Sequence, residues 1–365
     1  MASRKYDVVF VGGGLAALLL LNEMRPALSR RVAVIDPCPP SEPLLVHWSY
    51  WSHRQTFYDQ FSIGVWRRAK VADKKPEFIA PFTMRLVRSN DVFEHLDASL
   101  KSSSVEWIRA AARSVSRRGD GLYEVVTDAG AIDARWVFDS ACDVAPTFPS
   151  PNEPNAVLSG TGVRVTADRP VFDAGTATMF DPLDEQSFAY LLPLSSSEAL
   201  LESASFGLKS RKEDPAVLLR HLRSRHPGSH FVVTHVESGS IPLGFAPART
   251  TGPRHVLIGT KRGLVKPSAG YGIVRIAEES ELLARLWREH RPLPPSRRSP
   301  WRWRLLDKGF LQLAAKDPRR PLALLHHVMH GITLNRSLQL IDEQLSMQQL
   351  IPVLTAALPA MLRSP

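Results

Sequence analysis

Cysteine is scarce in this sequence, and long apolar runs are absent. Only two of the 365 residues are cysteines, Cys38 and Cys142, and their spacing fits neither a metal site nor a redox motif. We therefore expect two buried thiols in a reducing cytoplasm rather than a disulfide. No apolar run reaches the roughly eighteen residues of a spanning helix, so any membrane contact should be peripheral. No signal-peptide core opens the chain, so we expect no cleaved leader.

Signatures of nucleic-acid-binding modules are also missing, although the formal net charge is +10. Charge alone suits nucleic acid, anionic lipid or simple solubility, and without a motif we expect no nucleic-acid partner. Hydrophobic residues make up 44% and charged residues 22% of the chain, which is typical of a folded globular protein. The length predicts two lobes, or one discontinuous domain with an inserted lobe.

The first motif opens the chain. Residues 6–11 form an apolar run typical of a strand buried on both faces of a parallel sheet. Gly12, Gly14 and Ala17 follow and match the G-x-G-x-x-G/A pattern of dinucleotide-binding folds. In that pattern Gly12 allows the tight turn, Gly14 lets the backbone approach a pyrophosphate, and Ala17 lets helix and strand pack closely.

The segments after this motif complete a βαβ unit. An apolar helix is predicted through 18–24, and a second strand over 32–35 ends at Asp36. An acidic residue at this position can accept hydrogen bonds from a ribose hydroxyl, while helix N-terminal N–H groups meet the phosphates. The sequence therefore predicts a dinucleotide site formed by Gly12, Gly14, Ala17 and Asp36.

A second glycine-rich junction lies far along the chain. A buried strand is predicted over 255–259, and a helix begins at Ile273. Backbone N–H groups between them can reach the same cofactor, and contact at two points suits FAD better than NAD. The candidate cofactor-binding residues of this junction are Gly259, Thr260, Lys266, Pro267, Gly270 and Tyr271.

Residues 174–243 offer several strand candidates, interrupted by one predicted helix near 214–225. An antiparallel sheet over the cofactor is the expected substrate lobe. In the strand at 199–206, the two-residue period places Glu202 on the apolar face. Such a carboxyl group is either a rim residue at the sheet edge or a desolvated acid whose pKa is raised.

The remaining segments are less specific. The aromatic residues between Trp48 and Trp66 suit either a packed lobe or a pocket wall. The basic stretch at 291–304 is either a solvated linker or a contact for anionic lipid. The helical final segment contains His326 and His330 at a spacing that suits a metal, but no third ligand is near, so we expect no metal site.

These patterns predict an α/β protein with a Rossmann-type FAD-binding domain, an antiparallel substrate lobe and a helical C-terminal region. A strand at 136–139 and a proline-rich crossing at 146–154 support that division. The expected boundaries are 1–45, 101–150 and 244–290 for the FAD-binding domain, 46–100 and 151–243 for the substrate lobe, and 291–365 for the basic linker and helical cap.

Taken together, the segments resemble the lycopene cyclase family of FAD-dependent carotenoid cyclases. The matching features run in order along nearly the whole chain, which makes the resemblance specific. They are the G-x-G-x-x-A opening, Trp48-Ser49-Tyr50-Trp51, Met179-Phe180-Asp181, the apolar run at 188–194, Leu201-Glu202, the segment at 239–243, Gly259-Thr260 and the segment at 265–271.

The resemblance implies a non-redox cyclisation in carotenoid biosynthesis. In that family the end group of a linear polyene, lycopene, is protonated and closes to an ionone ring, and proton loss gives an isomeric product of the β-carotene type. FAD is required in its reduced form, with NADPH as the reductant. Glu202 occupies the position of the family's proposed acid, and Asp181 either orients it, provides a second carboxyl group or is a structural turn residue. A membrane-dwelling substrate also implies peripheral membrane association.

This chain departs from the family pattern near the expected site. Ser203 and Ala204 follow the acid where another acid and Thr are usual, Ser187 stands where Arg is common, and Ala269 replaces a usual Thr. A related prenyl or polyene substrate therefore remains open. The rival interpretations are an FAD-dependent monooxygenase or oxidoreductase and a non-enzymatic flavin or carotenoid carrier. Thr260 stands where many flavin hydroxylases carry Asp.

Overall fold

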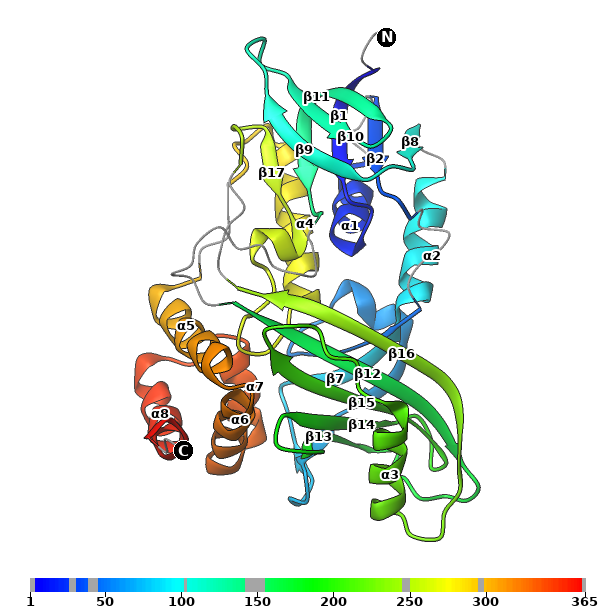
Figure 1. Ribbon diagram of the computed structural model, residues 1–365, viewed down its shortest axis with the longest axis vertical. Coiled ribbons are helices and arrows are strands. Elements are labelled where there is room, and N and C mark those ends of the chain that lie inside the picture. The colour runs from blue at the N-terminus through cyan, green and yellow to red at the C-terminus, as the bar shows by residue number, and fades with distance from the viewer. Residues whose placement is uncertain are drawn as a thin grey trace.

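The computed structural model describes residues 4–25, 31–38, 45–101, 104–141, 155–244, 250–294 and 299–362, with side chains as far as Thr355. Figure 1 shows a sheet with helices at the top, a larger sheet below it, and a group of C-terminal helices at its side. Three predicted features lie outside the described residues. They are Cys142, the proline-rich crossing at 146–154 and residues 295–298 of the basic stretch.

The upper sheet is the predicted Rossmann-type unit. Its core strand carries the fully buried Val8, Val9 and Phe10, which explains the apolar run at the start of the chain. The strands β8, β2, β1, β11 and β17 pair in parallel, and β9 and β10 extend the sheet as an antiparallel meander. The order is β8 (Val105–Ile108), β2 (Val32–Ile35), β1 (Arg4–Val11), β11 (Gly130–Asp139), β10 (Tyr123–Thr127) and β9 (Ala112–Arg117), with β17 (His255–Leu257) also paired to β11.

Two helices cover this sheet. The helix α1 (Leu15–Met24) follows the glycine motif, and its apolar residues are buried almost all round. It packs beside α4 (Ile273–Arg288), which begins at the residue predicted from the second glycine-rich junction. The short helix η3 (Gly259–Arg262) leads from β17 toward α4. Sequences far apart in the chain thus meet at the carboxyl ends of the parallel strands (Figure 1).

The larger sheet confirms the predicted antiparallel lobe. Its neighbours are antiparallel except for the pair β13 and β5. The helix α3 (Pro215–Arg225) covers one face and packs with Leu201, as the alternation in 199–206 requires. The order is β16 (Phe231–Leu243), β12 (Ala156–Ala167), β15 (Glu198–Gly207), β14 (Ser187–Pro193), β13 (Thr176–Pro182), β5 (Arg68–Val71) and β6 (Glu77–Phe78).

A third, three-stranded sheet lies between these two. Its strands run in the order β3 (His47–Ser52), β7 (Thr83–Arg88) and β4 (Ser62–Trp66), with η2 (Phe57–Phe61) and α2 (Ser89–Leu100) beside them. The aromatic cluster divides between the two predicted uses. Tyr50, Tyr58 and Trp66 are buried in the core, whereas Trp48 and Trp51 line a cavity.

The C-terminal region is helical, as predicted. Its elements are α5 (Trp301–Lys316), α6 (Arg319–Gly331), α7 (Leu334–Ile341) and α8 (Met347–Leu362). The predicted linker is shorter than expected, because its last four residues form the first turn of α5. None of the helices in the described ranges is long and apolar enough to cross a membrane. The rings of His326 and His330 lie 4.1 Å apart, and no third metal ligand joins them among the described residues.

One local prediction was wrong. Cys38 follows β2 in a bend and is exposed rather than buried. The apolar strand ends at Ile35, so the residues after Asp36 have already left the core. The thiol therefore lies on the surface.

Candidate active site

Two adjoining cavities lie where the sheets meet. The first, of about 740 Å³, opens at the carboxyl ends of the parallel strands. The second, of about 460 Å³, is lined by the inner face of the large sheet, by β3 and by the loop before α4. Leu15, Thr260 and Ile276 line both cavities, so a ligand in the first can reach the wall of the second.

The glycine motif forms one wall of the first cavity. Gly12 has a φ of 89°, and a Cβ there would lie 2.5 Å from Oγ of Ser140. Gly14 is the N-cap of α1 and has no capping side chain, and a Cβ on it would meet nothing within 4 Å. The first N–H groups and the positive end of the helix dipole therefore face space that suits a pyrophosphate. Ala17 is 1% exposed and lets α1 pack tightly on the sheet.

Asp36 lies at the end of β2, on the wall of the same cavity. Its Oδ2 accepts a 2.6 Å hydrogen bond from the backbone N–H of Gly13, and its Oδ1 accepts one of 2.7 Å from Cys38. These bonds fix the carboxylate beside the glycine turn, where a ribose hydroxyl of a dinucleotide would donate. The residues of this cavity thus fit the adenosine and pyrophosphate portions of FAD.

The second glycine-rich junction joins the two cavities. Gly259, with a φ of 62°, comes so close to α1 that a Cβ there would lie 2.8 Å from that of Ala16. Thr260 follows it on the wall of both cavities. Gly270 and Tyr271 line the second cavity, and the Tyr271 ring stacks on Trp51 with centroids 4.8 Å apart. These four predicted residues therefore lie together at the junction.

Lys266 and Pro267 differ from the other predicted cofactor residues. The ammonium group of Lys266 lies 3.0 Å from Oδ1 of Asp307 and 3.3 Å from Oε1 of Glu343, and its side chain is only 3% exposed. Neither Lys266 nor Pro267 lines either cavity. The lysine instead forms a buried ionic link between this loop and the C-terminal helices.

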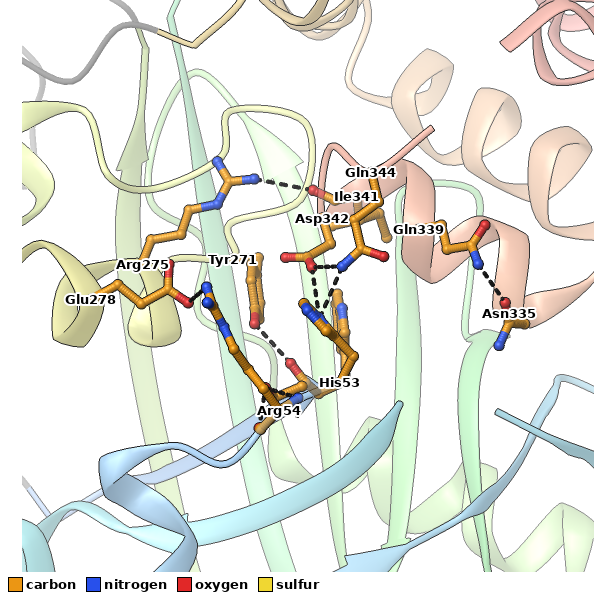
Figure 2. A network of polar contacts seen from close by, with 12 residues as sticks. His53, Arg54, Tyr271, Arg275, Glu278, Asn335, Gln339, Ile341, Asp342 and Gln344 are labelled. Atoms are coloured by element: carbon orange, nitrogen blue, oxygen red, sulfur yellow. Dashed lines mark hydrogen bonds and ion pairs between the residues drawn. The ribbon is translucent and has the colours of Figure 1, made fainter. Parts of the chain in front are cut away.

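Further polar contacts link the C-terminal helices to the rest of the structure (Figure 2). Nδ1 of His53, just after β3, lies 3.4 Å from Oδ2 of Asp342. Arg275, on α4, donates a 3.2 Å hydrogen bond to the backbone oxygen of Ile341. The C-terminal helices are thereby tied both to the end of β3 and to the start of α4.

The first cavity also contains an ionic cluster that no sequence motif predicted. Oδ2 of Asp139, at the end of β11, lies 2.6 Å from Nζ of Lys261 and 3.2 Å from Nε2 of His255. All three residues line the cavity. A carboxylate at the end of a parallel strand could have indicated this cluster, because the carboxyl ends of parallel strands lie along the same edge of the sheet.

Glu202 lies on β15 and lines the second cavity, as its place on the apolar face of the strand predicts. Burial raises the pKa of its carboxyl group to about 8, and the charge of Glu237 adds to that rise. The hydroxyl of Ser49 donates to its Oε2 at 3.2 Å and partly opposes the shift. At neutral pH this group is mostly a neutral carboxylic acid. It is therefore a desolvated acid on a cavity wall rather than a residue of the sheet edge.

A row of residues across the large sheet explains the coupling of the two glutamates. Tyr190 of β14 lies opposite Glu202, Gly162 of β12 lies opposite Glu202 on its other side, and Glu237 of β16 follows opposite Gly162. A Cβ on Gly162 would lie 2.8 Å from Cγ of Glu237. The absence of a side chain at Gly162 lets the Glu237 side chain occupy this position.

The strand β3 crosses this row. His47 and Ser49 are two residues apart, so they share one face of β3. Ser49 donates to Glu202, while the backbone N–H and Nδ1 of His47 both bond to Glu237, the latter at 2.7 Å. One strand therefore holds both carboxyl groups.

His47, Glu237 and His235 offer metal-ligand atoms within 4.8 Å of one another, a group that the sequence analysis did not find. His235 Nε2 lies 3.3 Å from Oε2 of Glu237. Nδ1 of His47 lies only 2.7 Å from the same oxygen, whereas two ligands of a tetrahedral zinc ion are about 3.4 Å apart. The arrangement is that of a direct hydrogen bond.

The structure does not bring Asp181 to Glu202. Oδ2 of Asp181 lies 2.8 Å from Nε2 of His221, and its Oδ1 accepts a 2.5 Å bond from Arg225, both on α3. The helix α3 covers the face of the large sheet that is opposite to the cavity. A bulge in β13, with Phe180 at a φ of 54°, shifts the alternation so that Asp181 turns away. Asp181 thus anchors α3 and does not orient Glu202.

The model of the protein family described as "Lycopene cyclase protein" matches residues 7–316 of this chain. No curated protein matches the sequence. Among solved structures, a geranylgeranyl bacteriochlorophyll reductase-like protein from Thermoplasma acidophilum is 14% identical, with a TM-score of 0.59 and 98% of each chain covered.

Two other solved structures share the fold. A halogenase solved in complex with FAD is 13% identical, with a TM-score of 0.53, covering 96% of this chain and 85% of its own. A p-nitrophenol 4-monooxygenase from Pseudomonas putida is 14% identical, with a TM-score of 0.54, covering 98% of this chain and 97% of its own. At these identities the likeness shows the FAD-binding flavoprotein fold.

Proposed function

The chain belongs to the lycopene cyclase family, and from that premise we propose that it is an FAD-dependent enzyme that cyclises the end groups of lycopene or a similar linear polyene without net redox change. The observation that carries the proposal is Glu202, a carboxylic acid with a pKa of about 8 on the wall of an internal cavity. The cavity adjoins a second one that fits FAD.

Protonation of an alkene carbon requires an acid that keeps its proton at working pH and faces a site with little water. With a pKa of about 8, Glu202 keeps its proton at pH 7 more readily than an ordinary glutamate does. A proton passed to the terminal double bond leaves a carbocation, and the neighbouring double bond closes the six-membered ring on it. Loss of a ring proton then gives an isomer of the substrate.

Aromatic faces in the cavity suit the cationic intermediate. Trp48, Trp51 and Tyr190 line the cavity that contains Glu202, and ring faces attract positive charge. Gly12, Gly14, Asp36, Gly259 and Thr260 are the residues that would hold FAD. Bound in its reduced form, with NADPH as the reductant, FAD would supply negative charge that favours the cation.

The alternative is a flavin-dependent monooxygenase or other oxidoreductase, the activity of some proteins with the same fold. Thr260, where many hydroxylases carry Asp, favours the cyclase. A cyclase acting on another polyene is the closer variant, because Ala204 and Ala269, two departures from the family pattern, line the cavity itself. These two substitutions change the wall of the cavity, whereas the proposed acid, Glu202, is still present.

Peripheral membrane contact belongs to the same proposal. Trp301 and Leu305 on α5 are 71% and 62% exposed, and three further exposed apolar residues, four and three positions apart, share a face of α8. Arg304 and Lys308 of α5 are exposed beside them and suit anionic headgroups. The three residues of α8 are Met347, Ile351 and Leu354.

Flotation with anionic vesicles at low salt tests this contact. We expect the protein to float with the vesicles, and Trp301→Ser with Leu305→Ser to reduce the bound fraction. Val232→Ser is the matched control, since Val232 is 67% exposed on β16. Protein that stays with the unbound fraction at low salt contradicts the membrane contact.

The activity itself is tested by product analysis. Flavin-loaded protein receives lycopene in liposomes with NADPH under anaerobic conditions, and the products are separated by chromatography and weighed by mass spectrometry. The proposal expects a product of unchanged mass with a blue-shifted absorption spectrum. A product that forms only in air and gains the mass of oxygen would support the monooxygenase instead.

A further inference from the structure

Lys261 presents a positive charge on the wall of the first cavity. Its ammonium group lies 2.6 Å from Oδ2 of Asp139, and both residues line that cavity. The side chain of Asp139 is only 4% exposed, whereas that of Lys261 is 23% exposed. The surface that this ion pair exposes therefore belongs mainly to Lys261, and a ligand in the cavity can reach it.

The ion pair has a fixed position and spare donors. Oδ1 of Asp139 accepts a 3.1 Å hydrogen bond from the backbone N–H of Ala141, and its Oδ2 lies 3.2 Å from Nε2 of His255. An ammonium group has three N–H donors. Within the described part of the chain, Asp139 is the only acceptor that Lys261 contacts. Two donors of Lys261 are therefore available to a ligand.

Two contacts place Lys261 beside the start of α1. Ser140, the residue after the paired carboxylate, donates its hydroxyl to the backbone oxygen of Gly12 at 3.3 Å. Gly259, two residues before Lys261, approaches α1 so closely that a Cβ there would lie 2.8 Å from that of Ala16. The two segments that hold the ion pair thus adjoin the glycine turn and the first turn of α1.

We propose that Lys261 binds the pyrophosphate of FAD. The N-terminus of α1 offers roughly half a positive charge, and its first turn, Leu15-Ala16-Ala17, has no charged side chain. Each phosphate of FAD is an anion, so a lysine beside this terminus supplies charge and N–H donors that the helix lacks. The inference rests on FAD as the cofactor of the proposed function and deepens the description of its site.

Titration of the apoprotein with FAD, followed by flavin fluorescence, tests the contact without turnover. Lys261→Gln removes the charge, Lys261→Arg keeps it, and Lys316→Gln removes an exposed charge at the end of α5. We expect Lys261→Gln to raise the Kd for FAD about 10–100-fold, because it loses a charge-assisted hydrogen bond. Lys261→Arg should lose less, and Lys316→Gln should keep the wild-type Kd. A wild-type Kd in Lys261→Gln overturns the inference.

A double variant separates phosphate binding from simple neutralisation of Asp139. Lys261→Gln leaves a buried carboxylate without its cation, which can impair folding by itself. Asp139→Asn with Lys261→Gln also removes the charge of that carboxylate, so it covers the case in which the single variant does not fold. We expect its Kd to stay raised, since no lysine reaches the phosphates. Recovery of the wild-type Kd overturns the inference and makes Lys261 a structural partner of Asp139.

Phosphorus NMR of bound FAD locates the contact on the cofactor. We expect the phosphorus resonances of FAD bound to Lys261→Gln to differ from those in the wild type, and those in Lys316→Gln to match the wild type. Unchanged resonances in Lys261→Gln overturn the inference even where the Kd is raised. A wild type that binds no FAD removes the cofactor and this inference together, whereas flavin-loaded protein that forms no cyclic product removes the proposed function alone.

Discussion

Glu202 and Glu237 lie on one face of the large sheet, separated only by Gly162 of the strand between them. Two carboxyl groups this close inside a cavity do not both carry charge easily. N–H donors from His47 contact Glu237, whereas Glu202 receives one hydroxyl and is desolvated. The environment therefore distinguishes the two carboxyl groups, and Glu202 is the one whose raised pKa suits the proposed proton donor.

Replacing Glu202 by Gln should abolish proton donation and keep the shape of the cavity. We expect Glu202→Gln to lower turnover about 10²–10⁴-fold, because the amide has no acidic proton, while bound FAD is unchanged. Turnover and flavin content of the purified variant check this. Glu198→Gln is the matched control, since Glu198 lies on the same strand but pairs with Arg164. A Glu202→Gln protein with wild-type turnover would contradict proton donation by Glu202.

The activity should fall as pH rises through about 8. The raised pKa means that Glu202 is protonated below this value and loses its proton above it, so the alkaline limb reports the acid. The charge of Glu237 contributes to the raised pKa, so the residual activity of Glu237→Gln should decline at a lower pH. A profile of turnover against pH for both proteins checks this, and an alkaline limb that Glu237→Gln leaves in place contradicts the coupling.

Asp181→Asn should affect stability more than catalysis. The variant loses charge-assisted bonds to His221 and Arg225, and we expect the free energy of unfolding to fall by about 1.5–3 kcal/mol. Turnover per folded molecule should stay close to that of the wild type. Chemical denaturation together with activity measurements separates the two effects. A stable but inactive Asp181→Asn protein would indicate that Asp181 acts in catalysis.

Gly12→Ala should impair FAD binding. The φ of 89° disfavours any side chain, and the new Cβ would collide with Oγ of Ser140, so the turn below α1 must shift. We expect most of the purified variant to lack flavin, as measured by the fluorescence of flavin released on denaturation. Gly119→Ala, where a Cβ meets nothing within 4 Å, should retain FAD. Equal flavin content in the two variants would contradict the assigned cradle.

The sequence predicted the elements whose signals are local. The strand, glycine turn, helix, strand and terminal Asp36 of the first unit follow one another, and each has its own pattern of burial or turn chemistry. The face of Glu202 followed from the period of two along a regular strand. These features needed no knowledge of what the segments pack against.

The remainder of the site depends on contacts that distant segments make. His47 and Glu237 are 190 positions apart, and neither belongs to a local motif. Asp181 was assigned from the family motif alone, and the motif does not indicate the bulge at Phe180 that turns this side chain toward α3. Lys266 lies in a family motif, but its partner Asp307 comes from a helix whose packing the sequence does not indicate.

Deuterium incorporation measures whether Glu202 starts the cyclisation by giving its proton to the polyene. Flavin-loaded protein in buffered D2O carries deuterium on the exchangeable carboxyl group of Glu202. We expect one deuterium in each ring that forms, seen by mass spectrometry as one mass unit per ring, and no such product from Glu202→Gln. A cyclic product without deuterium, or equal labelling by Glu202→Gln, would contradict proton donation by this residue.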